Sequence, residues 1–118
     1  MDVVYAHLDF RSEQSRREQA AEMIEVLRKR GRPVILMGDL NSGWGHENTA
    51  VRRLAAELDL HSYEPQDRSL ITIPKFKRRL DWILVSPEIE IRNYRVLEHQ
   101  VSDHLGVVSD LVINRACG

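Results

Sequence analysis

The alternation of apolar and polar residues along this chain predicts a series of strands and helices. Six short strand patterns cover Asp2 to Leu8, Arg32 to Met37, Leu70 to Ile73, Leu80 to Ser86, Ile89 to Leu97 and Gly106 to Asn114. The first is largely apolar, which predicts burial on both faces of that strand. The fifth alternates apolar and polar residues, which predicts one face in solvent.

A first helix is predicted between the first two strands. Its apolar residues recur at the i, i+3, i+4 and i+7 spacing of one buried stripe, made of Ala20, Met23, Ile24 and Leu27. Ser12 or Ser15 is suited to cap the start of this helix, and Ser15 with Glu18 fits a capping box. Gly31, after three basic residues, marks its end. Such a strand–helix–strand unit is typical of parallel or mixed pairing.

A second helix is predicted after a polar loop that runs from Asp39 to Glu47. Asn48 is suited to cap this helix. Its buried stripe consists of Val51, Leu54, Ala55 and Leu58. The chain has 118 residues and shows no repeat or linker-like stretch. The sequence therefore predicts an α/β fold with one domain over residues 1–118.

Composition and charge exclude several classes of protein. Hydrophobic residues make up 42% of the chain and charged residues 30%, as in ordinary soluble domains. The formal net charge of −1 gives no overall attraction to nucleic acid or to an anionic membrane. No apolar run reaches the roughly 20 residues of a membrane span, and no signal peptide is expected. The single Cys117 precludes an intrachain disulfide and favours a reducing compartment, so a cytoplasmic location is expected.

Three short polar motifs stand beside apolar runs. They are Gly38-Asp39-Leu40-Asn41, Leu80-Asp81-Trp82-Ile83 and Ser102-Asp103-His104. Together they supply three carboxylates, one amide and one imidazole. If strand ends bring these groups to one rim of a sheet, the residue types suit a metal and phosphate site.

Each motif also has a purely structural interpretation. In extended backbone, the side chain of Asn41 leaves on the same side as Asp39 and can donate to a phosphoryl oxygen. Alternatively, Asp39 and Asn41 bond local amides in a turn. Asp81 lies within an apolar strand and needs a partner, for which a protonated His is suited. Such an Asp–His pair could also be a buried hydrogen bond with no substrate nearby.

Taken together, the motifs resemble those of the endonuclease/exonuclease/phosphatase superfamily, in the same order. Tyr5-Ala6-His7-Leu8-Asp9, followed by the segment from Ser15 to Ala20, looks like a fourth motif found in its bacterial metal-dependent hydrolase branch. The resemblance extends from Val3 to Ile113. It implies a mixed β-sheet with helices on one face, which is the C-terminal half of a four-layer α/β/β/α sandwich.

The resemblance implies a metal-dependent phosphoesterase that acts by in-line attack of an activated water on a phosphodiester or phosphomonoester. Asp39 corresponds to the group that orients or deprotonates the water. Asn41 and His104 correspond to phosphate-binding groups, and Asp81 to the residue that orients His104. His7 corresponds to a phosphate ligand or general acid, although a lone His in an apolar strand is often structural.

The implied cofactor is Mg²⁺, with Mn²⁺ as a possible substitute. Asp103 and Asp39 correspond to its ligands, although Asp103 could also be a solvent-exposed loop carboxylate. His46, His61 and His99 match no motif.

A basic segment before the strand at Leu80 suggests a binding surface for a phosphate-ester substrate, with nucleic acid among the candidates. Lys75, Lys77 and Arg78 can neutralise phosphates and Trp44 can stack, although this segment could also be a solvated loop. Thr72-Ile73-Pro74 fits a Thr-x-Pro segment that the related hydrolases carry at this place.

The resemblance also implies two groups with no counterpart in this sequence. These are a metal-binding Glu on an early strand and an Asn on the first strand, both in the N-terminal half of the family fold. A homodimer, or pairing with a missing N-terminal half, is therefore expected to cover the bare sheet face. The alternative is a truncated, catalytically silent scaffold that acts as a binding or assembly module.

Overall fold

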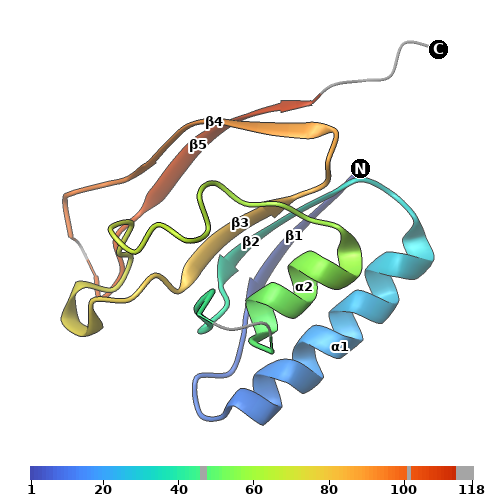
Figure 1. Ribbon diagram of the computed structural model, residues 1–118, viewed down its shortest axis with the longest axis horizontal. Helices are drawn as coiled ribbons and strands as arrows, with labels where there is room; N and C mark the ends of the chain where they lie inside the picture. Colours follow the sequence, from blue (N-terminus) through green and yellow to red (C-terminus); the bar gives the residue numbers. More distant parts are fainter. Residues whose placement is uncertain (46–47, 101, 114–118) are drawn as a thin grey trace.

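The computed structural model describes residues 1–45, 48–100 and 102–113, and the fold is α/β as predicted (Figure 1). Its elements are β1 (Asp2–His7), α1 (Glu13–Arg30), β2 (Val34–Asp39), α2 (Ala50–Leu58), the 3₁₀ helix η1 (Pro74–Phe76), β3 (Asp81–Val85), β4 (Ile89–Val96) and β5 (Val107–Ile113). The predictions for His46, Glu47, Asn114 and Cys117 lie outside the described residues.

The main sheet is mixed and has the order β1-β2-β3. The central strand β2 pairs in parallel with β1 and antiparallel to β3. The strand–helix–strand unit predicted parallel or mixed pairing; its two strands pair in parallel, and β3 makes the sheet mixed. β4 and β5 pair antiparallel in a second, two-stranded sheet, which Figure 1 shows beyond β3.

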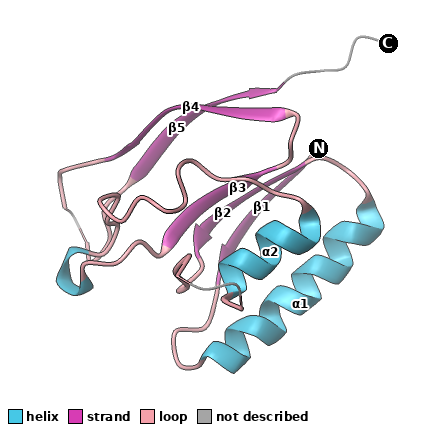
Figure 2. Ribbon diagram, in the orientation of Figure 1, coloured by secondary structure: helices cyan, strands magenta, loops and turns pink. Residues whose placement is uncertain are grey.

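Both helices cover the same face of the main sheet (Figure 2). The predicted stripes form the core of this layer. Ala20, Ile24 and Leu27 of α1 are buried, as are Val51, Leu54 and Ala55 of α2, while Met23 and Leu58 are partly buried. They pack against Leu36, Trp82 and Leu84 of the sheet. Neither helix in the described part of the chain is long and apolar enough to cross a membrane.

The ends of the helices differ in detail from the predicted caps. Ser12 is the N-cap of α1, and its Oγ accepts a hydrogen bond from the backbone N–H of Ser15 (3.0 Å), so the capping box starting at Ser15 is wrong. α2 begins one residue later than predicted, because Thr49 rather than Asn48 is at its N-cap. Thr49 makes no capping bond with its side chain. The hydroxyl of Ser42 instead accepts from the N–H of Val51 (3.2 Å).

The face of the sheet away from the helices is only partly covered. Ile35 and Val85 pack against Ile89 of β4 on this side. On β1, however, Val3 and Tyr5 are 64% and 74% exposed. The prediction that β1 is buried on both faces is therefore wrong, because no described element packs over this edge of the sheet.

The segment Leu70 to Ile73 is not a strand, in contrast to the prediction. Its only strand-like feature in the described residues is a single bridge between Ile73 and Arg78. The N–H groups of Thr72 and Ile73 both donate to the carbonyl of Arg78, each at 3.0 Å. Pro74 then begins η1, so the segment turns back on itself instead of extending beside another strand.

Gly38 permits the close pairing of β1 and β2 near the polar end of the sheet. It lies opposite Ala6 and has a φ of 137°, a conformation that L side chains rarely adopt. A Cβ at this position would lie 2.0 Å from the carbonyl oxygen of Ala6. Glycine is therefore required by both the backbone conformation and the available space.

We predict that Gly38→Ala destabilises the fold by at least about 2 kcal/mol, since it combines a steric clash with backbone strain. Gly31→Ala is the matched control. Gly31 also has positive φ (60°), but a Cβ there would have nothing within 4 Å, so only the backbone cost of about 1 kcal/mol applies. Urea unfolding of the two variants measures this difference. Equal losses of stability would contradict this account of Gly38.

Candidate active site

The register of the main sheet brings three polar residues into one row. His7 at the end of β1 pairs with Asp39 at the end of β2, and Asp39 pairs with Asp81 at the start of β3. Three of the predicted site residues therefore lie side by side at one rim of the sheet. His104 approaches the same rim from the loop before β5.

The carboxylate of Asp39 faces two imidazole rings. Its Oδ2 lies 3.5 Å from Nε2 of His7 and 3.3 Å from Nε2 of His104. On its other side, His104 donates its Nδ1–H to Oδ2 of Asp81 (2.8 Å). The predicted pairing of Asp81 with His104 is thus present, and this bond sets the ring so that Nε2 points toward Asp39.

The environment of His104 favours its charged form. Partial burial by itself lowers the pKa of His104, because it disfavours the imidazolium ion. The hydrogen bond with Asp81 and the charges of Asp81, Asp39 and Asp103 act in the opposite direction, and the net pKa lies above the usual 6.5. A protonated ring carries N–H groups on both nitrogens, so its Nε2 is a donor at this rim.

Asn41 adopts the turn that the sequence analysis gave as one alternative, not the extended backbone of the other. Its φ is 46°, in the left-handed region that Asn tolerates better than most residues. Its backbone N–H donates to Oδ1 of Asp39 (2.9 Å), and its side-chain Nδ2 donates to the carbonyl of Leu8 (2.7 Å). The turn occupies Oδ1 of Asp39, while Oδ2 of Asp39 faces the two histidines.

The rim of the sheet offers ligand atoms for a divalent cation. Ligand atoms of Asp39, Asp81 and His104 all lie within 4.8 Å of one another. Two carboxylates suit Mg²⁺ or Mn²⁺, which prefer oxygen ligands. Asp103 is exposed and does not belong to this group of described residues. Its charge nevertheless contributes to the raised pKa of His104.

Residues of the fourth motif form hydrogen bonds that hold the loop after β1. Arg16 of α1 donates from Nη1 to the carbonyl of Asp9 (3.1 Å), and the N–H of Asp9 donates to Oε1 of Gln19 (2.8 Å). The start of α1 is thereby tied to the loop that follows His7. The side chain of His7 itself is largely exposed beside Asp39.

Thr72 is a positioning residue whose role the sequence analysis did not identify. It is completely buried. Its Oγ1 accepts hydrogen bonds from the backbone N–H groups of Leu80 (3.0 Å) and Asp81 (3.2 Å). Its carbonyl accepts from the N–H of Leu105 (2.7 Å), the residue after His104. One threonine therefore holds the backbone beside both members of the Asp81–His104 pair.

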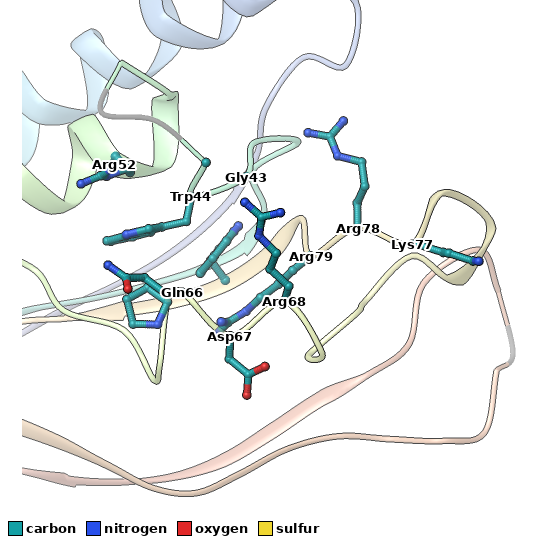
Figure 3. A pocket seen from close by; sticks show the side chains of 12 residues that line it. Gly43, Trp44, Arg52, Gln66, Asp67, Arg68, Lys77, Arg78 and Arg79 are labelled. Atoms are coloured by element: carbon teal, nitrogen blue, oxygen red, sulfur yellow. The ribbon is translucent and has the colours of Figure 1, made fainter.

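The basic segment contributes to a cavity that also involves Trp82, whose side chain lies on the helix-covered face of the sheet (Figure 3). Trp44, Lys77 and Arg78 line the cavity, whereas Lys75 is not among its lining residues. The Nζ of Lys75 lies 5.6 Å from the ring of Phe76. Arg52 and Arg68 also line the cavity, and the sequence analysis missed both. Arg52 lies in α2 and Arg68 in the loop before η1, and no sequence motif marks either residue.

We predict that Thr72→Val lowers the free energy of unfolding by about 1–3 kcal/mol, because two buried N–H groups lose their acceptor. The pKa of His104 also falls toward its usual value as the bond with Asp81 loosens. Urea unfolding and an NMR titration of His104 measure the two effects. Thr72→Ser keeps the hydroxyl and should retain the raised pKa. A Val variant with an unchanged His104 titration would contradict the positioning role.

Solved structures with the same fold come from bacteria and from humans. An endonuclease/exonuclease/phosphatase family protein of Bacteroides thetaiotaomicron is 23% identical, with a TM-score of 0.71 over 94% of this chain and 49% of that protein. The mannosyl-6-phosphatase of the same organism is 24% identical, with a TM-score of 0.69 over 92% and 50%. The human Nocturnin catalytic domain with a bound sulfate anion is 23% identical, with a TM-score of 0.74 over 93% and 46%.

At this level of identity the comparisons establish the fold, and the chain spans about half the length of these structures. No curated protein matches the chain significantly. The sequence profile of the Endonuclease/Exonuclease/phosphatase family matches residues 3–104, which include all four motifs. The chain therefore belongs to the endonuclease/exonuclease/phosphatase family and forms part of the domain of that family.

Proposed function

We propose that this chain carries part of the active site of a metal-dependent phosphoester hydrolase. The observation that supports this most directly is the environment of Asp39, whose Oδ2 lies within 3.5 Å of His7 and 3.3 Å of His104. A carboxylate beside imidazole N–H groups provides a base next to donors for a phosphoryl oxygen. Membership of the family supports the same class of reaction.

In the proposed reaction, Asp39 accepts a proton from a water molecule that attacks phosphorus. This requires the water to lie within about 3 Å of the Asp39 carboxylate. His104, protonated and held by Asp81, donates from Nε2 to a phosphoryl oxygen. His7 binds a second oxygen or protonates the leaving group. Asn41 fixes the turn that orients Asp39 and has a second amide hydrogen that can reach the phosphate.

The carboxylates of Asp39 and Asp81 are the described groups that best suit a divalent cation, Mg²⁺ or Mn²⁺. Asp103, which is exposed, would bind this cation through a water molecule. A bound cation supplies charge neutralisation at the phosphoryl oxygens. The side chains described above, in contrast, orient the water and the phosphate.

We expect the purified chain to hydrolyse a chromogenic phosphodiester or phosphomonoester with Mg²⁺ or Mn²⁺ and to be inactive in EDTA. Asp39→Asn and His104→Ala should each lower kcat/KM at least about a hundredfold, because each removes a proton acceptor or donor at the reacting phosphate. His99→Ala is the matched control, since His99 is exposed and matches no motif.

If the folded chain shows no turnover with either metal, the proposal fails for this chain. The alternative, a catalytically silent scaffold that acts as a binding or assembly module, is then favoured. Metal-dependent thermal stabilisation without turnover would identify a binding function. An activity that survives Asp39→Asn and His104→Ala would instead place the reaction elsewhere.

We also propose that a second sheet covers the open face of the main sheet. Tyr5, Met37 and Ile83 lie next to one another across the three strands on this face. Tyr5 is exposed, while Met37 and Ile83 are partly buried. The covering sheet comes either from a second copy of the chain, giving a homodimer, or from a polypeptide that carries the other half of the fold. Burial of this apolar face provides the driving force.

We predict a dimer by light scattering at high micromolar concentration, and its dissociation by the double change Val3→Glu and Tyr5→Glu. Phe76→Glu is the control, since Phe76 is 63% exposed but lies in η1, outside this face. A strictly monomeric wild-type chain would contradict the homodimer and leave the other half of the fold as the partner to test.

A further inference from the structure

One edge of the main sheet has no partner in the described part of the chain. β1 is the outermost strand of this sheet, and it pairs with β2 on its inner side (Figure 1). Among residues 1–45, 48–100 and 102–113, no strand or isolated bridge pairs with β1 on its outer side. We call this outer side of β1 the open edge.

The backbone groups at the open edge follow from the pairing of β1 with β2. The N–H groups of Asp2 and Leu8 donate to carbonyls of the segment that contains β2, at 2.8 and 3.0 Å. In a parallel ladder, the backbone groups of alternate residues point to the same neighbouring strand. The even-numbered residues of β1 therefore bond to β2, whereas the N–H and C=O groups of Val3 and Tyr5 point to the open edge.

Features that protect a sheet edge are present in other strands but not in β1. On the far side of the main sheet, Val85 of β3 exchanges backbone hydrogen bonds with His61, at 2.8 and 2.9 Å. In the second sheet, the register of β4 and β5 is interrupted between Arg92 and Arg95. β1 pairs with β2 without such a shift and contains no Lys, Arg or Pro. Bulges, charges and Pro discourage pairing with another chain, so the open edge remains suited to it.

An apolar hollow of about 440 Å³ accompanies the open edge. It lies between β1 and α1, and no residue of β2 or β3 lines it. Val4, Met23, Val26 and Leu27 form its apolar wall. Val26 is 58% exposed there. A chain that pairs with the open edge can therefore also bury apolar surface of α1.

The charges beside this hollow differ between its two ends. At one end, Arg30 (2.8 Å) and Arg32 (3.8 Å) both approach the single carboxylate of Asp2, which leaves a net positive charge. At the other end, Glu22 forms no salt bridge within the described part of the chain. Glu22 and Arg30 are about 12 Å apart along α1, and Val26 lies midway between them. The hollow thus has a negative end and a positive end.

A second copy of the chain, related by a two-fold axis, matches this surface. Antiparallel pairing centred on Val4 places Val3 of each copy opposite Tyr5 of the other, so that the outward backbone groups of these residues bond to one another. Val4 and Val26 line the same hollow, so the axis also passes near Val26 and brings the two α1 helices side by side and antiparallel. The negative end of each hollow then faces the positive end of the other.

We propose that β1 pairs edge to edge with β1 of a second copy of this chain, so that the main sheets of the two copies form one continuous sheet. The attraction comes from the backbone bonds of Val3 and Tyr5, from burial of the apolar hollow and from the opposite charges at its ends. This interface lies at the side of the sheet, and it is therefore separate from the covering of the open face proposed above. Either proposal can hold without the other.

Amide hydrogen exchange, followed residue by residue with NMR, tests the pairing without any substitution. The amides of Val4 and Ala6 bond to β2, so we expect them to be protected at every protein concentration. The amides of Val3 and Tyr5 should exchange fast in dilute solution and at least about tenfold more slowly at high micromolar concentration, as the dimer forms. If exchange of the Val3 and Tyr5 amides does not change with concentration, the edge pairing is refuted.

A proline substitution tests the outward backbone donor itself. Val3→Pro removes the N–H of Val3, which points to the open edge, and so leaves the bonds between β1 and β2 in place. Val3→Ala is the matched control, because it shortens the same side chain and keeps the N–H. We expect Val3→Pro to weaken the dimer at least about tenfold relative to Val3→Ala in sedimentation equilibrium, since both copies lose the donor. Equal dissociation constants for the two variants would contradict the proposed pairing.

Cysteine cross-linking tests the position of the two-fold axis. In a Cys117→Ser background, Val26→Cys should form an intermolecular disulfide on mild oxidation, because the two Cα atoms approach within about 7 Å. Ala21→Cys is the matched control, since Ala21 is also exposed on α1 but lines a hollow on the side of α2. Equal cross-linking of both variants reflects random collision and refutes the axis.

The outcomes separate this interface from other occupants of the open edge and from the covering of the open face. A dimer that leaves the Val3 and Tyr5 amides unprotected and Val26→Cys uncrosslinked overturns the edge pairing and places the contact on the open face. Protection of these amides that requires a polypeptide with the other half of the fold overturns the pairing of two copies. Protection and cross-linking by the chain alone support it.

Discussion

The register of β2 between its two neighbours is the constraint on which the candidate site depends. Because β2 runs parallel to β1 and antiparallel to β3, the end of β1, the end of β2 and the start of β3 meet at one rim. A slip of one residue in either ladder would turn the side chains of that strand to the other face. Gly38 helps to fix this register, since only glycine fits against the carbonyl of Ala6.

The part of the fold set by periodicity and by local sequence could be predicted. The two amphipathic helices, five of the six strands and the α/β class follow from spacing alone. A simple physical argument, that a carboxylate in an apolar strand needs a partner, predicted a partner for Asp81. That this partner is His104 was implied by the family resemblance, since the two residues are far apart in the chain.

The remaining features depend on conformations that composition does not reveal. Asn41 has positive φ, so the extended backbone on which the alternation rule depends is absent at this residue. The β-branched residues around Thr72 suggested a strand, whereas the backbone of this segment turns back to Arg78. The exposure of Val3 and Tyr5 reflects what packs beside β1, which no property of these residues can determine.

The bonds made by Arg79 have a consequence for the evolution of this region. By donating to the carbonyls of Tyr63 and Glu64, Arg79 closes the intervening loop at its base, only two residues before Asp81. Changes in loop length have a small entropic cost, about 0.6 kcal/mol for each doubling. Changes in length between Glu64 and Leu70, before the bonds that Thr72 makes, are therefore expected to leave β3 in place. The row of His7, Asp39 and Asp81 would then stay in place while that part of the loop varies.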